Sequence, residues 1–175
     1  MKKVSLLIHA YLAGCFILLA AITFSAQIAE KPDAVVTNIV GTWKGEGKGF
    51  GGSTKVEMKW ESVLNKKFVR LQYKTEIQTA NGKTQILEGY AFYKSLGNGK
   101  YQATWFDSTG DQLPIDASFS ENALTANWGT PTTKLGRTIY KLIAPEQIEI
   151  ADYIQIKDGT WKEFSRSTLK KEENN

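Results

Sequence analysis

A two-residue alternation of polar and apolar side chains runs through most of this sequence and restricts what the chain can fold into. Within residues 55–61, apolar side chains occupy every second position, and the same rhythm returns in residues 69–77. Successive side chains of a β-strand point to opposite faces, so a period of two indicates strands with one buried and one exposed face. We therefore expect an all-β protein.

Segments rich in turn-forming residues separate these alternating runs. Asn81-Gly82 and Gly97-Asn98-Gly99 are typical of β-hairpin turns. Together, the alternation and the turns predict about ten strands within residues 41–169, preceded by a linker or short helix at residues 26–40. Consecutive hairpins favour an antiparallel meander, and closing it removes exposed sheet edges. The expected fold is therefore an antiparallel up-and-down β-barrel, followed by a disordered tail at residues 170–175.

Residues 1–25 differ in composition from the rest of the chain. Lys2 and Lys3 precede an apolar stretch, and the first acidic residue is Glu30. This pattern predicts an export signal or a membrane anchor. Each of these alternatives places the barrel outside the cytoplasm, in the periplasm or secreted.

Three ways of processing this segment stay open. Signal peptidase can cleave near residues 23–26, where small side chains occupy the required positions. Alternatively, Leu12-Ala13-Gly14-Cys15 matches a lipoprotein box, in which Cys15 is lipidated and anchors the protein facing the periplasm. The segment can also stay as an uncleaved anchor, because its apolar stretch approaches the ~20 residues that span a bilayer.

The predicted barrel lacks the side chains used in much of enzyme and metal chemistry. The only cysteine, Cys15, and the only histidine, His9, both lie in the N-terminal segment. The barrel therefore has no thiolate, no imidazole and no disulfide, and we predict neither a metal site nor a cofactor. Without Lys2 and Lys3, the 22 basic residues become 20 against 18 acidic residues, a net charge of +2. This balance argues against nucleic acid as a partner, and only the N-terminal segment is expected to contact a membrane.

A glycine-rich stretch opens the predicted barrel. Residues 47–52 match the G-x-G-x-x-G spelling of a dinucleotide-binding loop, but the alternating strand that follows provides no helix to hold a phosphate. On a strand, Trp43 shares one face with the glycines at positions 41, 45, 47, 49 and 51. Glycine inside a strand indicates a sharp bend or a place where another group approaches closely.

Short motifs in this stretch resemble known barrels. Gly41-Thr42-Trp43 resembles the G-x-W signature of the calycin superfamily, which includes the lipocalins, and residues 41–47 are similar to the start of nitrobindin-like barrels. Residues 101–108 and 158–164 resemble a group of uncharacterised bacterial secreted domains with the same fold.

The resemblance implies structural roles and one possible cofactor. In lipocalins the G-x-W tryptophan closes one end of the barrel beneath a late basic residue, which assigns these roles to Trp43 and Arg166. Nitrobindin-like barrels bind haem through a histidine, which this barrel lacks. Haem binding would therefore need a tyrosine ligand, Tyr73 or Tyr90.

A barrel of this size is either filled by its own side chains or holds one small ligand. The aromatic residues expected to line such a pocket are Trp60, Tyr73, Tyr90, Trp105 and Trp128. Glu88 shares strand parity with Tyr90, and a buried carboxylate needs a partner such as Arg137 or the polar head of a ligand. The opposite register stays open; it directs Leu87, Gly89, Ala91 and Tyr93 inward and exposes Glu88.

These observations predict an exported barrel that binds a small, largely apolar molecule and performs no chemistry. One alternative is a filled barrel that acts as an interaction module of the cell envelope. A haem protein with a tyrosinate ligand is the other alternative. All three functions follow from the same expected shell, and they differ in what occupies its interior.

Overall fold

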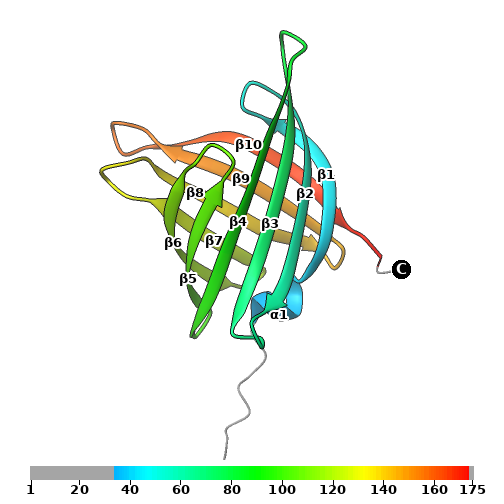
Figure 1. Cartoon of the computed structure of the whole chain (residues 1–175), viewed down its shortest axis with the longest axis vertical. Helices are drawn as coiled ribbons and strands as arrows, with labels where there is room; N and C mark the ends of the chain where they lie inside the picture. The colour runs from blue at the N-terminus through cyan, green and yellow to red at the C-terminus, as the bar shows by residue number, and fades with distance from the viewer. Residues whose placement is uncertain (1–33, 174–175) are drawn as a thin grey trace, which may run out of the picture. The chain divides into compact units, whose positions relative to one another are not determined.

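The computed structural model describes residues 34–173. Ten strands form a closed barrel in which each strand pairs antiparallel with its sequence neighbours, and the first strand pairs with the last (Figure 1). This confirms the predicted all-β, up-and-down barrel. The strands are β1 (Gly41–Gly49), β2 (Gly52–Val63), β3 (Phe68–Thr79), β4 (Thr84–Gly97), β5 (Lys100–Asp107), β6 (Gln112–Ser120), β7 (Ala123–Gly129), β8 (Leu135–Ala144), β9 (Gln147–Gln155) and β10 (Trp161–Lys171).

One short helix, α1 (Ala34–Asn38), precedes the barrel and lies at its lower end in Figure 1. The turns that join β2 to β3 and β4 to β5 lie at this α1 end, whereas those that join β1 to β2, β5 to β6 and β7 to β8 lie at the opposite, open end. Within residues 34–173, no helix has the length and apolar character needed to cross a membrane. The predicted export segment, including Cys15, falls outside the described residues.

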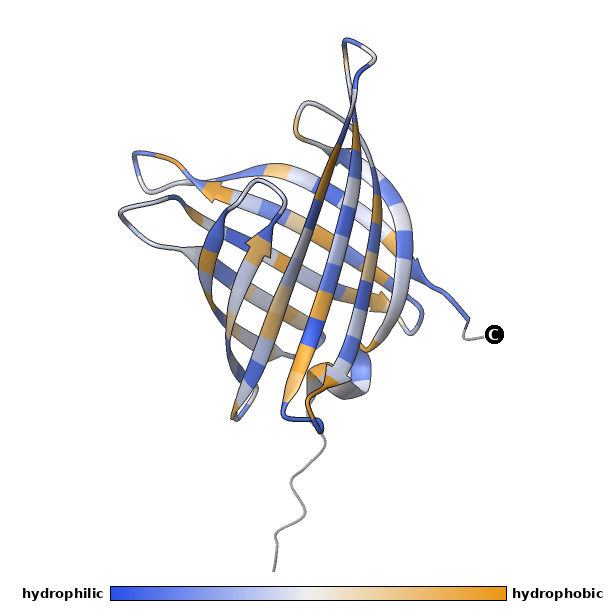
Figure 2. Cartoon of the chain, in the orientation of Figure 1, coloured by the Kyte–Doolittle hydropathy of each residue, from blue (hydrophilic) through white to orange (hydrophobic). Residues whose placement is uncertain are grey.

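The alternation predicted from the sequence appears directly in the strands, as the banding in Figure 2 shows. In β2, Val56, Met58 and Trp60 are buried, while Lys55 and the other intervening residues face solvent. Burying one large apolar side chain contributes about 1.5–3 kcal/mol, and the inner wall repeats this contribution along every strand. The interior of the barrel is therefore the hydrophobic core of the domain.

Trp43 closes the α1 end, as the resemblance implies. Its side chain is 0% exposed, and its Nε1 donates a hydrogen bond of 2.8 Å to the carbonyl oxygen of Ile39, just after α1. The basic residue beside it is Lys171, the partner of Trp43 across β1 and β10, with its Nζ 5.3 Å from the ring centre. The prediction that Arg166 has this role is wrong.

Arg166 is directed to the outer face because its neighbours in β10, Ser165 and Ser167, are buried. Its guanidinium forms ion pairs of 2.5 Å with Glu149 and with Glu163. Strand parity therefore excludes Arg166 from the interior, and two outer carboxylates hold it in place.

The glycines of β1 permit β10 to approach closely enough to close the barrel. A Cβ atom on Gly45 would clash with the carbonyl oxygen of Thr168, and one on Gly47 would clash with that of Arg166. The close approach predicted from the glycines is thus made by the backbone of β10 itself. A side chain at either position would push apart the two strands that join the ends of the sheet.

Candidate functional site

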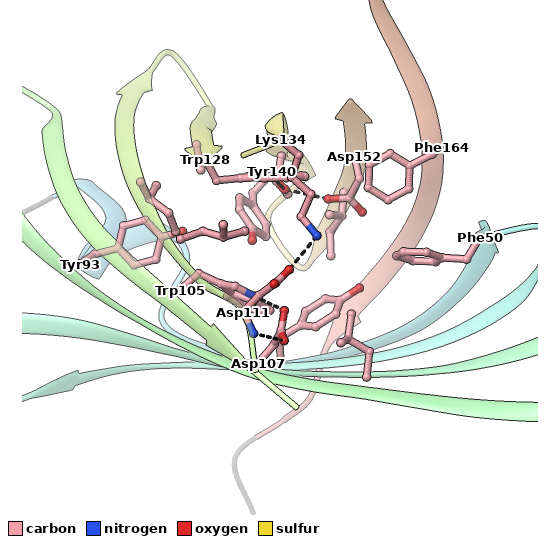
Figure 3. Close-up of a pocket in the computed structure, with 17 residues that line it drawn as sticks. Phe50, Tyr93, Trp105, Asp107, Asp111, Trp128, Lys134, Tyr140, Asp152 and Phe164 are labelled. Carbon is pink, nitrogen blue, oxygen red and sulfur yellow. Dashed lines mark hydrogen bonds and ion pairs between the residues drawn. The ribbon is translucent and has the colours of Figure 1, made fainter. Parts of the chain in front are cut away.

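A cavity of about 180 Å³ lies inside the barrel towards the open end (Figure 3). Its wall includes Tyr73 from β3, Trp105 from β5 and Trp128 from β7. The α1 end of the interior is packed with buried side chains, among them Trp43 and Trp60. The barrel is therefore filled in one half and hollow in the other.

Two glycines make room for the cavity tryptophans. A Cβ atom on Gly89 of β4 would clash with the ring of Trp105. A Cβ atom on Gly136 of β8, which lies directly opposite Trp128, would clash with the ring of Trp128. Each indole thus lies against bare backbone, and its position is set by the missing side chain of a neighbouring strand.

The polar edges of both indoles are satisfied within the protein. Trp105 Nε1 donates to Asp107 Oδ2 at 2.9 Å, and Trp128 Nε1 donates to Thr138 Oγ1 at 3.1 Å. These hydrogen bonds fix the two rings and consume the only polar group that each ring has. The indoles therefore offer the cavity apolar surface and π-electron density.

Within the described part of the chain, three aspartates line the cavity, and Asp152 of β9 is the one outside the turn that contains Asp107 and Asp111. Thr138 Oγ1 donates a hydrogen bond of 2.7 Å to Asp152 Oδ1, and Ser165 is also hydrogen-bonded to this carboxylate. Burial raises the pKa of Asp152 to about 6, against the opposing effect of these hydrogen bonds. Asp152 is consequently ionised at pH 7 and becomes neutral in mild acid.

Three tyrosines extend the polar side of this region. Tyr73 and Tyr140 line the cavity together with Tyr93. Burial raises the pKa of all three phenols above the ordinary value. At neutral pH these side chains are uncharged hydroxyl groups, and burial opposes their conversion to tyrosinate.

The mouth of the cavity combines an aromatic pair with an ion pair. The rings of Phe50 and Phe164 meet edge to face with their centres 5.2 Å apart. Phe164 occupies a β-bulge in β10, and this irregularity turns its side chain towards the cavity. Lys134 Nζ pairs with Asp111 Oδ2 at 2.7 Å, as Figure 3 shows.

Three of the residues predicted to form a pocket, Tyr73, Trp105 and Trp128, line this cavity. Trp60 does not. It is 1% exposed and packs in the filled half, with ring-centre distances of 5.3 Å to both Tyr93 and Tyr140. Whether the three cavity residues contact a ligand stays a prediction.

The inward placement predicted for Glu88 and Tyr90 is wrong, and the alternative register is the one adopted. In β4, Gly89, Ala91 and Tyr93 are buried, which directs Glu88 and Tyr90 to the outer face. The neighbouring strand explains this choice, because the Trp105 ring needs the space that only Gly89 leaves open.

Arg137, predicted to be a polar contact in the pocket, also lies on the outer face of the barrel. Its Nε donates to Asn127 Oδ1 at 2.8 Å, and its guanidinium lies 4.3 Å from the ring centre of Trp161. Its inward neighbours in β8 are Gly136 and Thr138, which are buried. The prediction that Glu88 and Arg137 provide the polar contacts of a pocket is therefore not fulfilled.

Sequence reasoning missed Asp152, Thr138 and Phe164. The inward direction of Asp152 could have been predicted from the sequence, because Asp152 continues the alternation that directs Ile148 and Ile150 inward. The direction of Phe164 could not, since the bulge that redirects it depends on the pairing of β10 with β9. The cavity thus contains carboxylates, such as that of Asp152, other than the one predicted at Glu88.

Among residues 34–173, no three His, Cys, Asp or Glu side chains gather closely enough to hold a metal ion. The acidic segment at residues 107–111 is a turn. Partial burial opposes ionisation of Asp107, yet hydrogen bonds from Thr109, Trp105 and Asp111 hold its pKa below the usual value. Asp107 therefore serves to fix the turn and the Trp105 ring.

Solved structures of other proteins have a similar fold. The crystal structure of Rv2717c from M. tuberculosis aligns with a TM-score of 0.60 and 12% sequence identity, covering 82% of this chain and 99% of that chain. The S-type phycobiliprotein lyase CPES from Guillardia theta aligns with a TM-score of 0.56 and 8% identity, covering 80% and 92%. At such identities the likeness shows the fold alone, so membership of the calycin superfamily stays a prediction.

A comparison with curated proteins gave no match. A family model does match, over residues 29–171, which include α1 and all ten strands of the barrel. The chain therefore belongs to the family described as Protein of unknown function (DUF1579).

Proposed function

We propose that this protein binds a small, largely apolar molecule in the cavity at the open end of the barrel. The observation that carries the proposal is the pair of indoles, Trp105 and Trp128, whose N–H groups are both satisfied by the protein while their rings line the cavity. A cavity with such walls gains free energy by exchanging water for an apolar group. That the protein binds this molecule without catalysing a reaction stays a prediction.

The size of the cavity limits the ligand. A dry apolar cavity of about 150 Å³ holds a benzene molecule, and this cavity measures about 180 Å³. A single ring or a short branched chain fits this volume, whereas a haem macrocycle is far larger. Of the tyrosines considered as haem ligands, Tyr90 faces outward and Tyr73 has a raised pKa. We therefore do not propose haem as the ligand.

We place this activity in the periplasm or outside the cell. The support is the basic and then apolar composition of residues 1–25, with cleavage, lipidation at Cys15 or an uncleaved anchor as the alternatives. The intact mass of the protein, measured in both the membrane and the soluble fractions of its own cells, distinguishes these three, since each leaves a different mature chain. A mass equal to the full chain without lipid, found in the soluble fraction, would contradict all three.

Tryptophan fluorescence tests the binding proposal. Single-ring apolar compounds such as toluene and ethylbenzene are expected to change the emission of the protein in a saturable way, because Trp105 and Trp128 lose contact with water. Trp128→Phe is expected to reduce the amplitude of the change. Trp161→Phe is the matched control, because Trp161 lies on the outer face against Arg137 and its loss leaves the cavity intact. If the panel gives no saturable change, the proposal fails for this class of ligand.

A second candidate function is supported by the outer face of β4 and β5. Tyr90 of β4 and Phe106 of β5 are directly opposite each other and are 41% and 43% exposed. Ile86 and Phe92, also in β4, are exposed as well. An apolar stripe of this kind is typical of an interaction surface. Docking of another envelope protein on this stripe is compatible with an occupied or an empty cavity.

Crosslinking in intact cells separates the two functions. If the stripe docks a partner, Tyr90→Ser combined with Phe106→Ser should abolish a specific crosslinked species while the fluorescence response to single-ring compounds persists. Trp128→Phe should have the opposite effect, because Trp128 lies inside the barrel. A crosslinking pattern that both variants leave unchanged would remove the stripe from consideration.

A further inference from the structure

A carboxylate without a cationic partner lies in the aromatic cavity. Among residues 34–173, no lysine or arginine nitrogen approaches within 4 Å of Asp152, and the lysine at the mouth, Lys134, is paired with Asp111. Removing an ionised carboxylate from water costs several kcal/mol unless a charge or hydrogen bonds compensate. Two hydroxyl groups, from Thr138 and Ser165, provide the compensation that the protein supplies.

Asp152 can accept further hydrogen bonds in addition to those from these two hydroxyl groups. A carboxylate has about four lone-pair sites, and two donors occupy two of them. The hydroxyls also fix its position, since Thr138, Asp152 and Ser165 are consecutive partners across β8, β9 and β10. The remaining acceptor capacity is available to a donor inside the cavity, of which Asp152 forms part of the wall.

The aromatic walls favour the same kind of occupant. The face of an aromatic ring carries negative charge density and attracts cations, most strongly for tryptophan. Tyr73, Trp105 and Trp128 line the cavity, and the positive N–H edges of both indoles are bound to Asp107 and Thr138. Ring faces and carboxylate therefore act together, and both oppose an anion.

We propose that the ligand is a small organic cation, a single-ring or short-chain amine whose ammonium group pairs with Asp152 while its apolar part packs against Trp105 and Trp128. This inference rests on the proposed binding function and names its ligand class. The ammonium supplies the positive charge that the protein itself does not place beside Asp152.

The charge on Asp152 makes binding depend on pH. Its pKa is raised by burial to about 6, so the carboxylate that attracts the cation forms as the pH rises through that value.

The other titratable groups near Asp152 are Tyr73 of β3, Tyr140 of β8 and Glu163 of β10. Both phenols have raised pKa values and Glu163 has a lowered one, so none of the three titrates near pH 6. At the mouth, Asp107 also has a lowered pKa, and Lys134 and Asp111 pair with each other. Affinity for an amine is expected to rise between pH 5 and 7, whereas affinity for a neutral compound is expected to stay constant.

Three probes of similar size and different charge test the proposal by calorimetry at pH 7.5. Benzylamine, a cation, is expected to bind at least about tenfold more tightly than neutral benzyl alcohol, because its ammonium adds an attraction between full charges to the hydrogen bond that an alcohol hydroxyl can also donate to Asp152. The benzoate anion is expected to bind most weakly. Asp152→Asn should reduce the ratio between amine and alcohol to about one while the alcohol still binds. Asp116→Asn, which changes an exposed carboxylate on the outer face of β6, is the matched control and should leave the ratio unchanged.

The outcomes separate this inference from the proposed function. If benzyl alcohol binds as tightly as benzylamine, the cation preference is overturned and the apolar binding site stands. If the amine preference persists in Asp152→Asn, Asp152 is not the counter-ion. If none of the three probes binds, both proposals fail. The pH profile of the unaltered protein gives a test that does not depend on a variant: an amine affinity that is flat from pH 5 to 7 contradicts the proposal.

Thermal unfolding adds a measurement that does not depend on any ligand. A carboxyl group whose pKa is raised on folding destabilises the folded state as the pH rises. For Asp152 this loss of stability develops between the unfolded pKa, about 4, and the folded pKa, about 6. Asp152→Asn removes this loss, so the variant is expected to unfold no earlier than the unaltered protein at pH 8. A variant that is much less stable at pH 8 would show that Asp152 is retained for stability and would contradict a role reserved for a ligand.

Discussion

Trp43→Ala is expected to lower the free energy of unfolding by about 3–5 kcal/mol, the range for removing a large buried aromatic side chain. Trp43 has no exposed surface and closes the α1 end of the barrel. The substitution leaves a cavity, deprives the Ile39 carbonyl of its donor and removes the ring that Lys171 covers. Denaturation by urea, followed by circular dichroism, measures the change.

Trp161→Ala is the control for this experiment. It removes the same side chain from the outer face, where the ring contacts Arg137, and is expected to cost less than about 1 kcal/mol. Trp43→Phe keeps most of the buried area and loses the hydrogen bond to Ile39, so an intermediate effect is expected. A loss below about 1 kcal/mol for Trp43→Ala would show that Trp43 does not hold the α1 end together.

Gly47→Val is expected to destabilise the barrel by at least about 3 kcal/mol, the upper end of the range for overpacking. The new Cβ would clash with the Arg166 carbonyl oxygen. A main-chain atom within a strand pair cannot move aside without breaking the pairing of β1 with β10. The substitution is therefore expected to open the barrel at the seam between its first and last strands.

Glu46→Val provides a matched control, because it adds the same side chain to the adjacent, exposed position of β1. Valine suits a strand, so this variant is expected to change stability by less than about 0.5 kcal/mol. Hydrogen exchange of the β1 and β10 amides locates the damage. Unchanged stability in Gly47→Val, or exchange that increases elsewhere and not at the seam, would contradict the role assigned to these glycines.

Strand parity explains which interior residues could be predicted. Tyr73 lies in a long run with a clear period of two, so its inward position followed from the pattern alone. In β4 both parities carry large apolar residues, and the sequence of that strand does not distinguish them. The outcome was decided by β5, since Trp105 occupies the volume beside Gly89 and only one register of β4 provides it. Glu88 and Tyr90 were misplaced for this reason.

The position of a residue along the barrel axis was harder to predict than its direction. Trp60 points inward, as expected, but lies in the filled half and not in the cavity. Lys171, and not Arg166, covers Trp43 because the pairing of β1 with β10 sets them opposite each other. Such alignments depend on the stagger between strands that are distant in the sequence, and residue type carries little information about it.

Local chemistry was sufficient to predict an all-β chain of about ten strands that closes on itself, because alternation and turn residues act over a few neighbouring positions. Local chemistry was not sufficient to predict the cavity. It exists because Gly89 and Gly136 admit two indoles, because a bulge redirects Phe164, and because three adjacent strands bring Thr138, Asp152 and Ser165 into one row. Each of these depends on cross-strand register, which arises only when segments far apart in the chain pair and pack against one another.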